Sequence, residues 1–203
     1  MKFLKLDINK HDLNKVSELI YETELTIFKQ LLGENEIEAV QNIKKLVKSG
    51  NNSFGHEHIH VVVDDDENML GILVSFCGRE MSLWDDFKEY SKVLRFYNFL
   101  KYAVKGTLIS ELLTASVGKN DYYLSNIAVD PQFRGQGIGT YILESAFKAA
   151  DKKGCKRVLL DVTLNNEGAR RLYERFGFKV YSKKDPKLIF KGKGTLNMEH
   201  FVD

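Results

Sequence analysis

Apolar and polar residues recur with regular periods along most of the chain, and these periods predict its strands and helices. In the first two fifths, apolar residues spaced three or four apart indicate helices, and short β-branched runs indicate strands. An acidic run at residues 64–68 is typical of a hairpin turn. We expect strands over residues 3–8, 58–63 and 69–76, and helices over residues 13–20 and 23–47, the second broken near Gly33.

The last third of the chain has the most regular pattern. Pro131 ends one strand because it cannot donate to a sheet, and Gly154 and Gly177 each suit the end of a helix. Asn165 or Asn166 is the expected cap of the last helix. We expect strands over residues 122–129, 157–162, 178–181 and 196–200, and helices over residues 138–153 and 166–176.

Between these two parts, residues 81–115 are rich in aromatic side chains that recur at threes and fours. This segment is predicted to form two helices that part near Gly106. Strands that alternate with helices, together with one hairpin, predict an α/β (α+β) fold with a mixed sheet. Residues 1–203 are expected to form one domain, in which residues 81–115 are a helical insertion between the third and fourth strands.

Composition excludes several classes of protein. The 203 residues are 43% apolar and 29% charged, which is ordinary for a soluble globular protein. A net charge of +2 argues against a nucleic-acid partner. No run of about 18 apolar residues or signal peptide is found, so no membrane partner is expected. The densest basic stretch is interpreted as a solvated edge; it contains Lys183, Lys184, Lys187, Lys191 and Lys193.

The two cysteines, Cys77 and Cys155, lie far apart in the sequence and form no C-x-x-C pattern. A disulfide framework would need more of them. Both are expected to be reduced, and the chain is expected to be cytoplasmic.

The candidate chemistry lies in a loop between the strand at 122–129 and the next helix. Glycines alternate at Gly135, Gly137 and Gly139 and open the helix, where free N–H groups and the helix dipole attract phosphate oxygens. Arg134 adds a fork of charged donors. A P-loop is excluded because no Gly-Lys-Ser/Thr follows, and a dinucleotide fingerprint would need glycine at Ile142.

Two motifs resemble one family. The pattern Arg134-x-x-Gly137-x-Gly139 is similar to the acyl-CoA pyrophosphate loop of the GNAT superfamily of N-acyltransferases. A second pattern, Asn166-x-x-Ala169-x-x-Leu172-Tyr173-x-x-x-Gly177-Phe178, resembles that family's late helix and the strand after it. The resemblance is strong over residues 121–181. It implies a sheet that splays, acetyl-CoA as co-substrate, an amine acceptor and no metal.

The resemblance also implies roles for particular residues. The splayed strand would hold pantetheine through Ile127, Ala128 and Val129. Asn166 would contact the pantetheine arm, and Tyr173 would lie near the thioester and protonate the leaving thiolate. The simpler interpretation of Tyr173 is a core side chain on the buried stripe of its helix. The pyrophosphate would lie on the loop residues, namely Arg134, Gly135, Gln136, Gly137, Ile138, Gly139 and Thr140.

A thioester is already activated, so a positioned neutral amine could attack it directly in a ternary complex. A backbone N–H of the splayed strand would stabilise the oxyanion. Some relatives carry a glutamate base on this strand, but here Ser125 and Asn126 occupy it. A water chain or a residue of the 81–115 insertion could replace that base. The missing carboxylate also leaves a non-catalytic acyl-CoA sensor as the alternative function.

Two further features stay open at this stage. The insertion could cover the acceptor cleft, add to the core or form a homodimer face. His56, His58 and His60 alternate, so on a strand they would share one face, as a metal site or a base cluster would require. Neighbouring members would stand roughly 6–7 Å apart on a straight strand, too far for all three to bind one zinc. Structural histidines are therefore the favoured interpretation.

Overall fold

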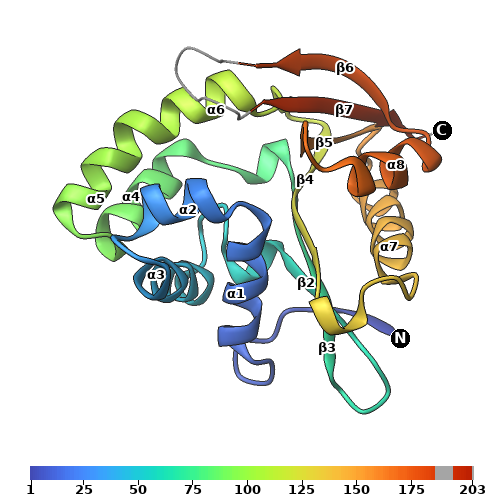
Figure 1. Cartoon of the computed structure of the whole chain (residues 1–203), viewed down its shortest axis with the longest axis horizontal. Helices are drawn as coiled ribbons and strands as arrows, with labels where there is room; N and C mark the ends of the chain where they lie inside the picture. Colours follow the sequence, from blue (N-terminus) through green and yellow to red (C-terminus); the bar gives the residue numbers. More distant parts are fainter. Residues whose placement is uncertain (186–193, 203) are drawn as a thin grey trace.

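The computed structural model describes residues 1–185 and 194–202, and it contains one seven-stranded sheet with helices on both faces (Figure 1). The strand order is β1-β2-β3-β4-β5-β7-β6, and β4 and β5 are the parallel pair among antiparallel neighbours. The predicted α/β class and mixed sheet are therefore confirmed. The strands are β1 (Lys2–Lys5), β2 (Ile59–Val63), β3 (Met69–Cys77), β4 (Asp121–Val129), β5 (Arg157–Thr163), β6 (Lys179–Lys184) and β7 (Thr195–Phe201).

The helices divide between the two faces of the sheet. Helices α1 to α6 lie on one side in Figure 1, and α7 and α8 lie on the other. The first group consists of α1 (Leu13–Thr23), α2 (Leu25–Leu32), α3 (Glu36–Ser49), α4 (Leu83–Val93), α5 (Phe96–Lys101) and α6 (Thr107–Leu113). The second consists of α7 (Ile138–Lys152) and α8 (Glu167–Arg175).

Each face of the sheet has its own apolar core, because successive side chains of a strand point to opposite faces. Val61 contributes to the core under α1 and α3, whereas Val62 contributes to the core under α7. Both valines are fully buried. The second core also contains Cys77 and Cys155, which are free thiols.

The long helical stretch predicted over residues 23–47 is broken twice. A first break lies at Glu24, whose backbone is not helical (φ −150°, ψ 61°) and separates α1 from α2. The second lies at the expected Gly33, where α2 ends. Asn35 then caps α3 by accepting a hydrogen bond from the backbone N–H of Glu38. Propensity alone did not mark the break at Glu24, because glutamate is a good helix former.

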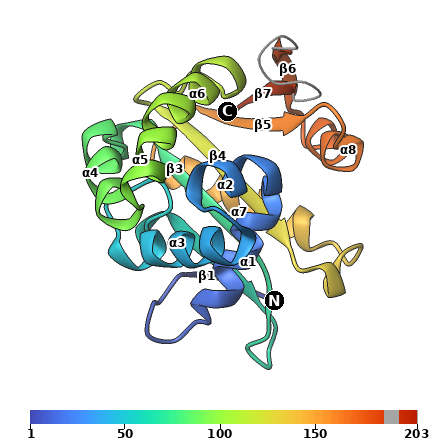
Figure 2. The same cartoon turned by 60° about the vertical axis from the view of Figure 1, so that its left-hand side comes forward.

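The predicted break of the insertion at Gly106 is wrong. The chain leaves the helix earlier, at Leu94 and Arg95, and Gly106 instead ends a π-helical turn, Tyr102–Gly106, between α5 and α6. Leu94 is 5% exposed and packs into the first core, and Arg95 pairs with Glu34 and Glu38. The helix therefore ends at a buried residue, which the spacing of aromatic residues did not reveal. The insertion forms α4, α5 and α6; α4 and α5 lie beside α3 and α2 (Figure 2), whereas the end of α6 contacts β6 and β7.

An irregularity in β4 shapes the functional region. Asn126 is paired with Val74 and Leu124 with Ser75, so Ser125 is an extra residue without a partner on β3. Such a β-bulge bends a strand and increases its twist. The parallel pairing with β5 ends at Leu124 and Leu160, directly before the bulge. The two strands separate beyond this point, as a splayed sheet requires.

An ion pair fixes the closed end of these two strands. Asp121, the first residue of β4, accepts hydrogen bonds from Nε and Nη2 of Arg157 at 3.0 and 2.6 Å. Burial tends to raise the pKa of Asp121, but the bonds from Arg157 and from the backbone N–H of Gly118 outweigh it and lower the pKa. Strand separation therefore starts from an anchored end.

We expect Asp121→Asn to lower the free energy of unfolding by about 1–3 kcal/mol at pH 7, because the buried charged bond to Arg157 is lost. A lowered carboxyl pKa stabilises the fold above the ordinary value of about 4 and ceases to do so as pH falls through the folded-state pKa. The difference from wild type should therefore shrink in urea unfolding at pH 3. Glu174→Gln, which alters an exposed ion pair, is the control. A difference that does not change with pH would contradict this account.

Candidate active site

A cleft of about 840 Å³ opens where β4 and β5 separate. One wall comes from the end of α1, from α2 and from α6, and the other comes from β5 and α8. The point of separation, beyond Leu124 and Leu160, is called the apex of the cleft below. The cleft thus reaches from the α1–α2 side of the sheet to the α8 side.

The separated part of β4 directs backbone groups into this cleft. Asp130 donates its backbone N–H to Leu70 of β3 at 2.9 Å. Alternate N–H groups along a strand point to opposite neighbours, so Ile127 and Val129 point theirs away from β3. The Nε of Arg134 reaches the carbonyl oxygen of Val129 from that side, at 3.1 Å. A ligand in the cleft could therefore pair with the backbone of Ile127 and Val129.

The predicted glycine loop leads directly into α7, as expected. Gly135 and Gly137 have φ of 79° and 80°, which favours glycine, and an added Cβ at either would meet nothing within 4 Å. Gly139 differs, because its Cβ would approach Cδ2 of Leu172 in α8 to 3.2 Å. The open side of the loop is therefore at Gly135 and Gly137, whereas Gly139 lets α7 and α8 pack closely.

Other loop residues have distinct surroundings. The side chain of Ile138 is 2% exposed and belongs to the second core, so only its backbone could contact a ligand. Gln136 is exposed and Thr140 half-buried. Arg134 lines the mouth of the cleft and pairs with Glu22 at the end of α1, with Nη2 to Oε2 at 3.1 Å. This pair joins the loop to the opposite wall.

Asn166 is the cap of α8, which settles the choice between Asn165 and Asn166. Its Oδ1 accepts a hydrogen bond from the backbone N–H of Ala169 at 3.1 Å. Both asparagines line the cleft. The side-chain amide nitrogen of Asn166 is therefore the polar group that it can offer to a ligand.

Tyr173 lies on α8 and lines the cleft, although it is only 8% exposed. Its ring packs edge-on against Phe178 with centroids 5.9 Å apart, and burial raises its pKa to about 12. The phenol therefore keeps its proton at neutral pH. Within the described part of the chain no group forms a hydrogen bond with its hydroxyl, so Tyr173 is both a core residue and a group that can reach the cleft.

Two further residues lie at the apex, Tyr123 and Asp161, which no sequence motif had indicated. The hydroxyl of Tyr123 on β4 donates a hydrogen bond to Oδ2 of Asp161 on β5, at 2.7 Å. Both residues line the cleft. The sequence signal for this pair is a carboxylate between Leu160 and Val162 in an otherwise apolar strand. Burial of an unpaired charge costs free energy, so such a residue is expected to have a polar partner.

Ser125 and Asn126 hold the bulge against the face of the sheet that α1 covers. Nδ2 of Asn126 donates to Oγ1 of Thr23 at 2.8 Å, and the Ser125 hydroxyl donates to Oδ1 of Asn126 at 2.9 Å. These bonds tie β4 to the end of α1. The two side chains therefore hold the bulge in place, and neither supplies a carboxylate.

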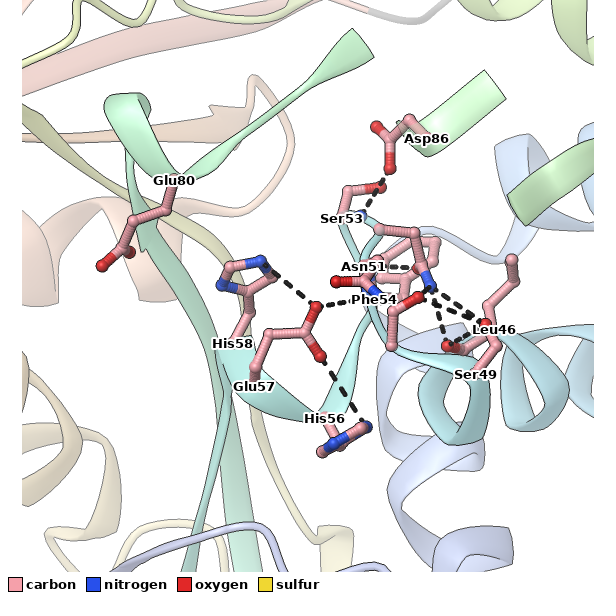
Figure 3. A network of polar contacts seen from close by, with 12 residues as sticks. Leu46, Ser49, Asn51, Ser53, Phe54, His56, Glu57, His58, Glu80 and Asp86 are labelled. Atoms are coloured by element: carbon pink, nitrogen blue, oxygen red, sulfur yellow. Dashed lines mark hydrogen bonds and ion pairs between the residues drawn. The ribbon is translucent and has the colours of Figure 1, made fainter. Parts of the chain in front are cut away.

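The three alternating histidines do not share one face, because His56 and His58 belong to a 3-10 turn and only His60 lies on β2. His60 stacks on Phe3 at 4.7 Å, and burial lowers its pKa to about 4. His56 and His58 flank Glu57 in a separate polar network, and the charge of Glu80 acts on His58 from nearby (Figure 3). Among the described residues no group of three His, Cys, Asp or Glu side chains could hold a metal ion.

Comparison with known proteins agrees with this geometry. Residues 52–178, more than half of the chain, match the profile described as the Acetyltransferase (GNAT) family. The chain belongs to this family.

The similar proteins are named as N-acetyltransferases. The chain is 35% identical over 60 residues to "Putative [ribosomal protein bS18]-alanine N-acetyltransferase" of Bacillus subtilis, covering 30% of the chain and 40% of that protein. It is 39% identical over 82 residues to thialysine N-epsilon-acetyltransferase of Mus musculus, covering 40% and 48%. The chain thus spans less than half the length of these GNAT relatives.

Solved structures share the fold over nearly the whole chain. An N-acetyltransferase from Staphylococcus aureus Mu50 superposes with a TM-score of 0.75 at 17% identity, covering 98% of this chain and 100% of that one. The NatC complex bound to Gag peptide and CoA gives 0.60 at 15% identity, covering 100% and 98%. At such low sequence identity, these superpositions show only that the fold is shared. No helix among the described residues is long and apolar enough to cross a membrane.

The cap of α8 can be tested separately from any ligand. Asn166→Ala should lower the free energy of unfolding by about 1 kcal/mol, since a helix N–H loses its partner. Asn166→Asp keeps an acceptor oxygen and adds a favourable charge at the helix N-terminus, so it should be close to wild type. Urea unfolding of both variants measures the difference. Equal stability of the two variants would show that the cap contributes nothing.

Proposed function

We propose that this GNAT protein transfers the acetyl group of acetyl-CoA to a primary amine by direct attack in a ternary complex. The observation that carries the proposal is the cleft between β4 and β5. Arg134, at the start of the open glycine loop before α7, lines one end of it, and the buried phenol of Tyr173 lines its interior. That arrangement fits a long cofactor with a diphosphate and a thioester. Residues 1–203 would act as one domain, with residues 81–115 inserted into it.

The proposed roles follow the positions of the residues. Backbone N–H groups of the 134–140 loop would bind the pyrophosphate, because the start of the 15-residue helix α7 carries partial positive charge. The β4 backbone at Ile127 and Val129 would pair with pantetheine, with Ala128 between them. A free N–H there would also stabilise the oxyanion. Asn166 would contact the same arm through its amide nitrogen.

Tyr173 is proposed to supply the proton that the sulfur needs as the C–S bond breaks. Burial holds its pKa near 12, so it is a protonated donor throughout the range in which enzymes work. Its position on α8 puts this donor on the side of the cleft opposite the α1–α2 wall. The acceptor amine would then approach from the α1–α2 wall.

The acceptor wall indicates the kind of amine. It carries large apolar side chains from α2, the loop before η1 (His56–His58) and α6, namely Ile27, Phe28, Phe54, Ile109 and Leu113. These side chains can receive an amine that is carried on an apolar group. Relatives are named for alanine of a ribosomal protein, for thialysine and for N-alpha acetylation. We therefore propose a peptide N-terminus as the acceptor.

Cofactor binding is tested at the glycine loop. Gly137→Ala should weaken CoA binding in calorimetry by about tenfold, because a positive φ costs an L-residue roughly 1–2 kcal/mol and redirects the N–H groups that face the phosphates. Gly154→Ala is the matched control, since Gly154 also has a positive φ of 65° with open space around it, but lies beyond the far end of α7. Equal losses of affinity in both variants would count against the phosphate site.

Catalysis is tested at Tyr173. With acetyl-CoA and a panel of free-amine peptides, thialysine and spermidine, wild type should release free thiol. Tyr173→Phe should lower turnover about 100-fold, the usual effect of losing one proton donor, while CoA affinity stays unchanged. Tyr141→Phe is the control, because that hydroxyl bonds the backbone of Met1 outside the cleft. Full activity of Tyr173→Phe would leave Tyr173 a core residue only. CoA binding without thiol release would indicate a sensor.

A further inference from the structure

The apex of the cleft holds a buried carboxylate that the proposed roles above do not use. Asp161 is the first residue of β5 beyond the last pair with β4, and Tyr123 comes directly before the last paired residue of β4. Their side chains meet across the separating strands, with Tyr123 Oη and Asp161 Oδ2 at 2.7 Å. The pair therefore lies where the two strands part, at the inner end of the cleft.

The remaining acceptor positions of Asp161 are occupied by protein groups. The backbone N–H of Ala115, the last residue of the insertion, donates to Oδ2 and Oδ1 at 2.9 and 3.1 Å. Nδ2 of Asn197 on β7 donates to Oδ1 at 2.5 Å. A substrate amine would therefore meet the oxygen of Tyr123 before the carboxylate behind it.

The electrostatics of the pair set where its proton lies. Burial raises the pKa of Asp161 above the ordinary carboxyl value, and hydrogen bonds from Tyr123, Ala115 and Asn197 with the charge of Lys184 offset this only in part. Burial and the neighbouring carboxylate hold the pKa of Tyr123 well above 10. The phenol of Tyr181 on β6 also interacts electrostatically with Tyr123 and Asp161. The resting state is thus a neutral phenol beside a carboxylate that is more basic than usual.

The faces of the sheet place this pair opposite Tyr173. Tyr122 and Leu124 of β4 belong to the core under α7, so Tyr123 between them points to the other face. Tyr173 belongs to the α7 core. A thioester at the apex would therefore have one tyrosine on each side, with Tyr123 on the side of the acceptor wall.

We propose that Tyr123 and Asp161 form the proton-accepting pair for the attacking amine. This inference rests on the proposed acetyl transfer. As the N–C bond forms, the amine proton passes to the oxygen of Tyr123, and the phenolic proton passes to Asp161. The electron pair of the breaking C–S bond goes to sulfur, which takes the proton of Tyr173. Solvent later returns a proton to Tyr173 and removes one from Asp161.

The arrangement compensates for the missing strand carboxylate. Tyr123 is the catalytic member, because it would touch the amine, and Asp161 acts through it. A neutral phenol alone is a poor base, but transfer of its own proton to Asp161 means that no phenolate has to form. The insertion takes part indirectly, since its end fixes Asp161 through the N–H of Ala115.

The test compares Tyr123→Phe, Asp161→Asn and the double variant on the best acceptor found in the peptide, thialysine and spermidine panel. Each single variant should lower kcat at pH 7 about 100-fold, as expected for loss of a base. CoA affinity by calorimetry and the KM for the acceptor should change little. The double variant should be about as slow as either single one, because the two groups act as a unit.

A pH profile separates this role from a structural one. The deficit of Tyr123→Phe should shrink toward pH 10, because hydroxide then replaces the lost base. Tyr181→Phe removes a nearby phenol that lies outside the cleft, and it should keep full activity. A deficit that is constant with pH, or losses that add in the double variant, would overturn the proposal.

The outcomes also separate this inference from the proposed function. If wild type transfers acetyl groups and Tyr123→Phe is equally active, the proton pair is wrong and the acetyltransferase stands. If wild type binds CoA but releases no thiol with any amine of the panel, both are overturned. A variant that binds CoA normally and melts at the wild-type temperature, yet is slow, supports the pair, because misfolding is then excluded.

Discussion

Separation of β4 from β5 beyond Leu124 and Leu160 is the constraint on which the rest of the site depends. Backbone N–H and C=O groups are strong hydrogen-bonding groups and are rarely left unpaired inside a protein. Beyond this point β4 and β5 are not hydrogen-bonded to each other, so their backbone groups must bond to a ligand or to water. The bulge at Ser125 lies directly beyond the last pair, where it bends β4, and the Arg157–Asp121 pair holds the other end closed.

The same separation brings together groups from distant parts of the chain. The cleft that it opens is lined by the end of α1, by α2, by α6 and by α8. The insertion contributes a wall through α6 and an N–H to Asp161, so it belongs to the site as well as to the core. Of the three roles considered for the insertion, this placement agrees with a wall of the cleft and with a part of the core.

Two tyrosines of raised pKa face the cleft from opposite sides of the sheet. Burial acts on both, but Tyr123 has a carboxylate behind it and Tyr173 has an apolar ring, Phe178. The carboxylate behind Tyr123 can accept a proton, whereas the apolar ring behind Tyr173 cannot, so Tyr173 can act only as a donor. Both residues are tyrosines, so the difference comes from the group that lies behind each hydroxyl.

The sequence by itself determined the strands, most helices and the loop at Gly135 to Gly139, because these features depend on local periodicity and backbone freedom. It did not determine the break at Leu94, the turn that holds His56 and His58, or the meeting of Tyr123 with Asp161. Those depend on burial and on register between strands far apart in the chain. Residues 38 positions apart became partners only when β4 and β5 paired in parallel and then separated.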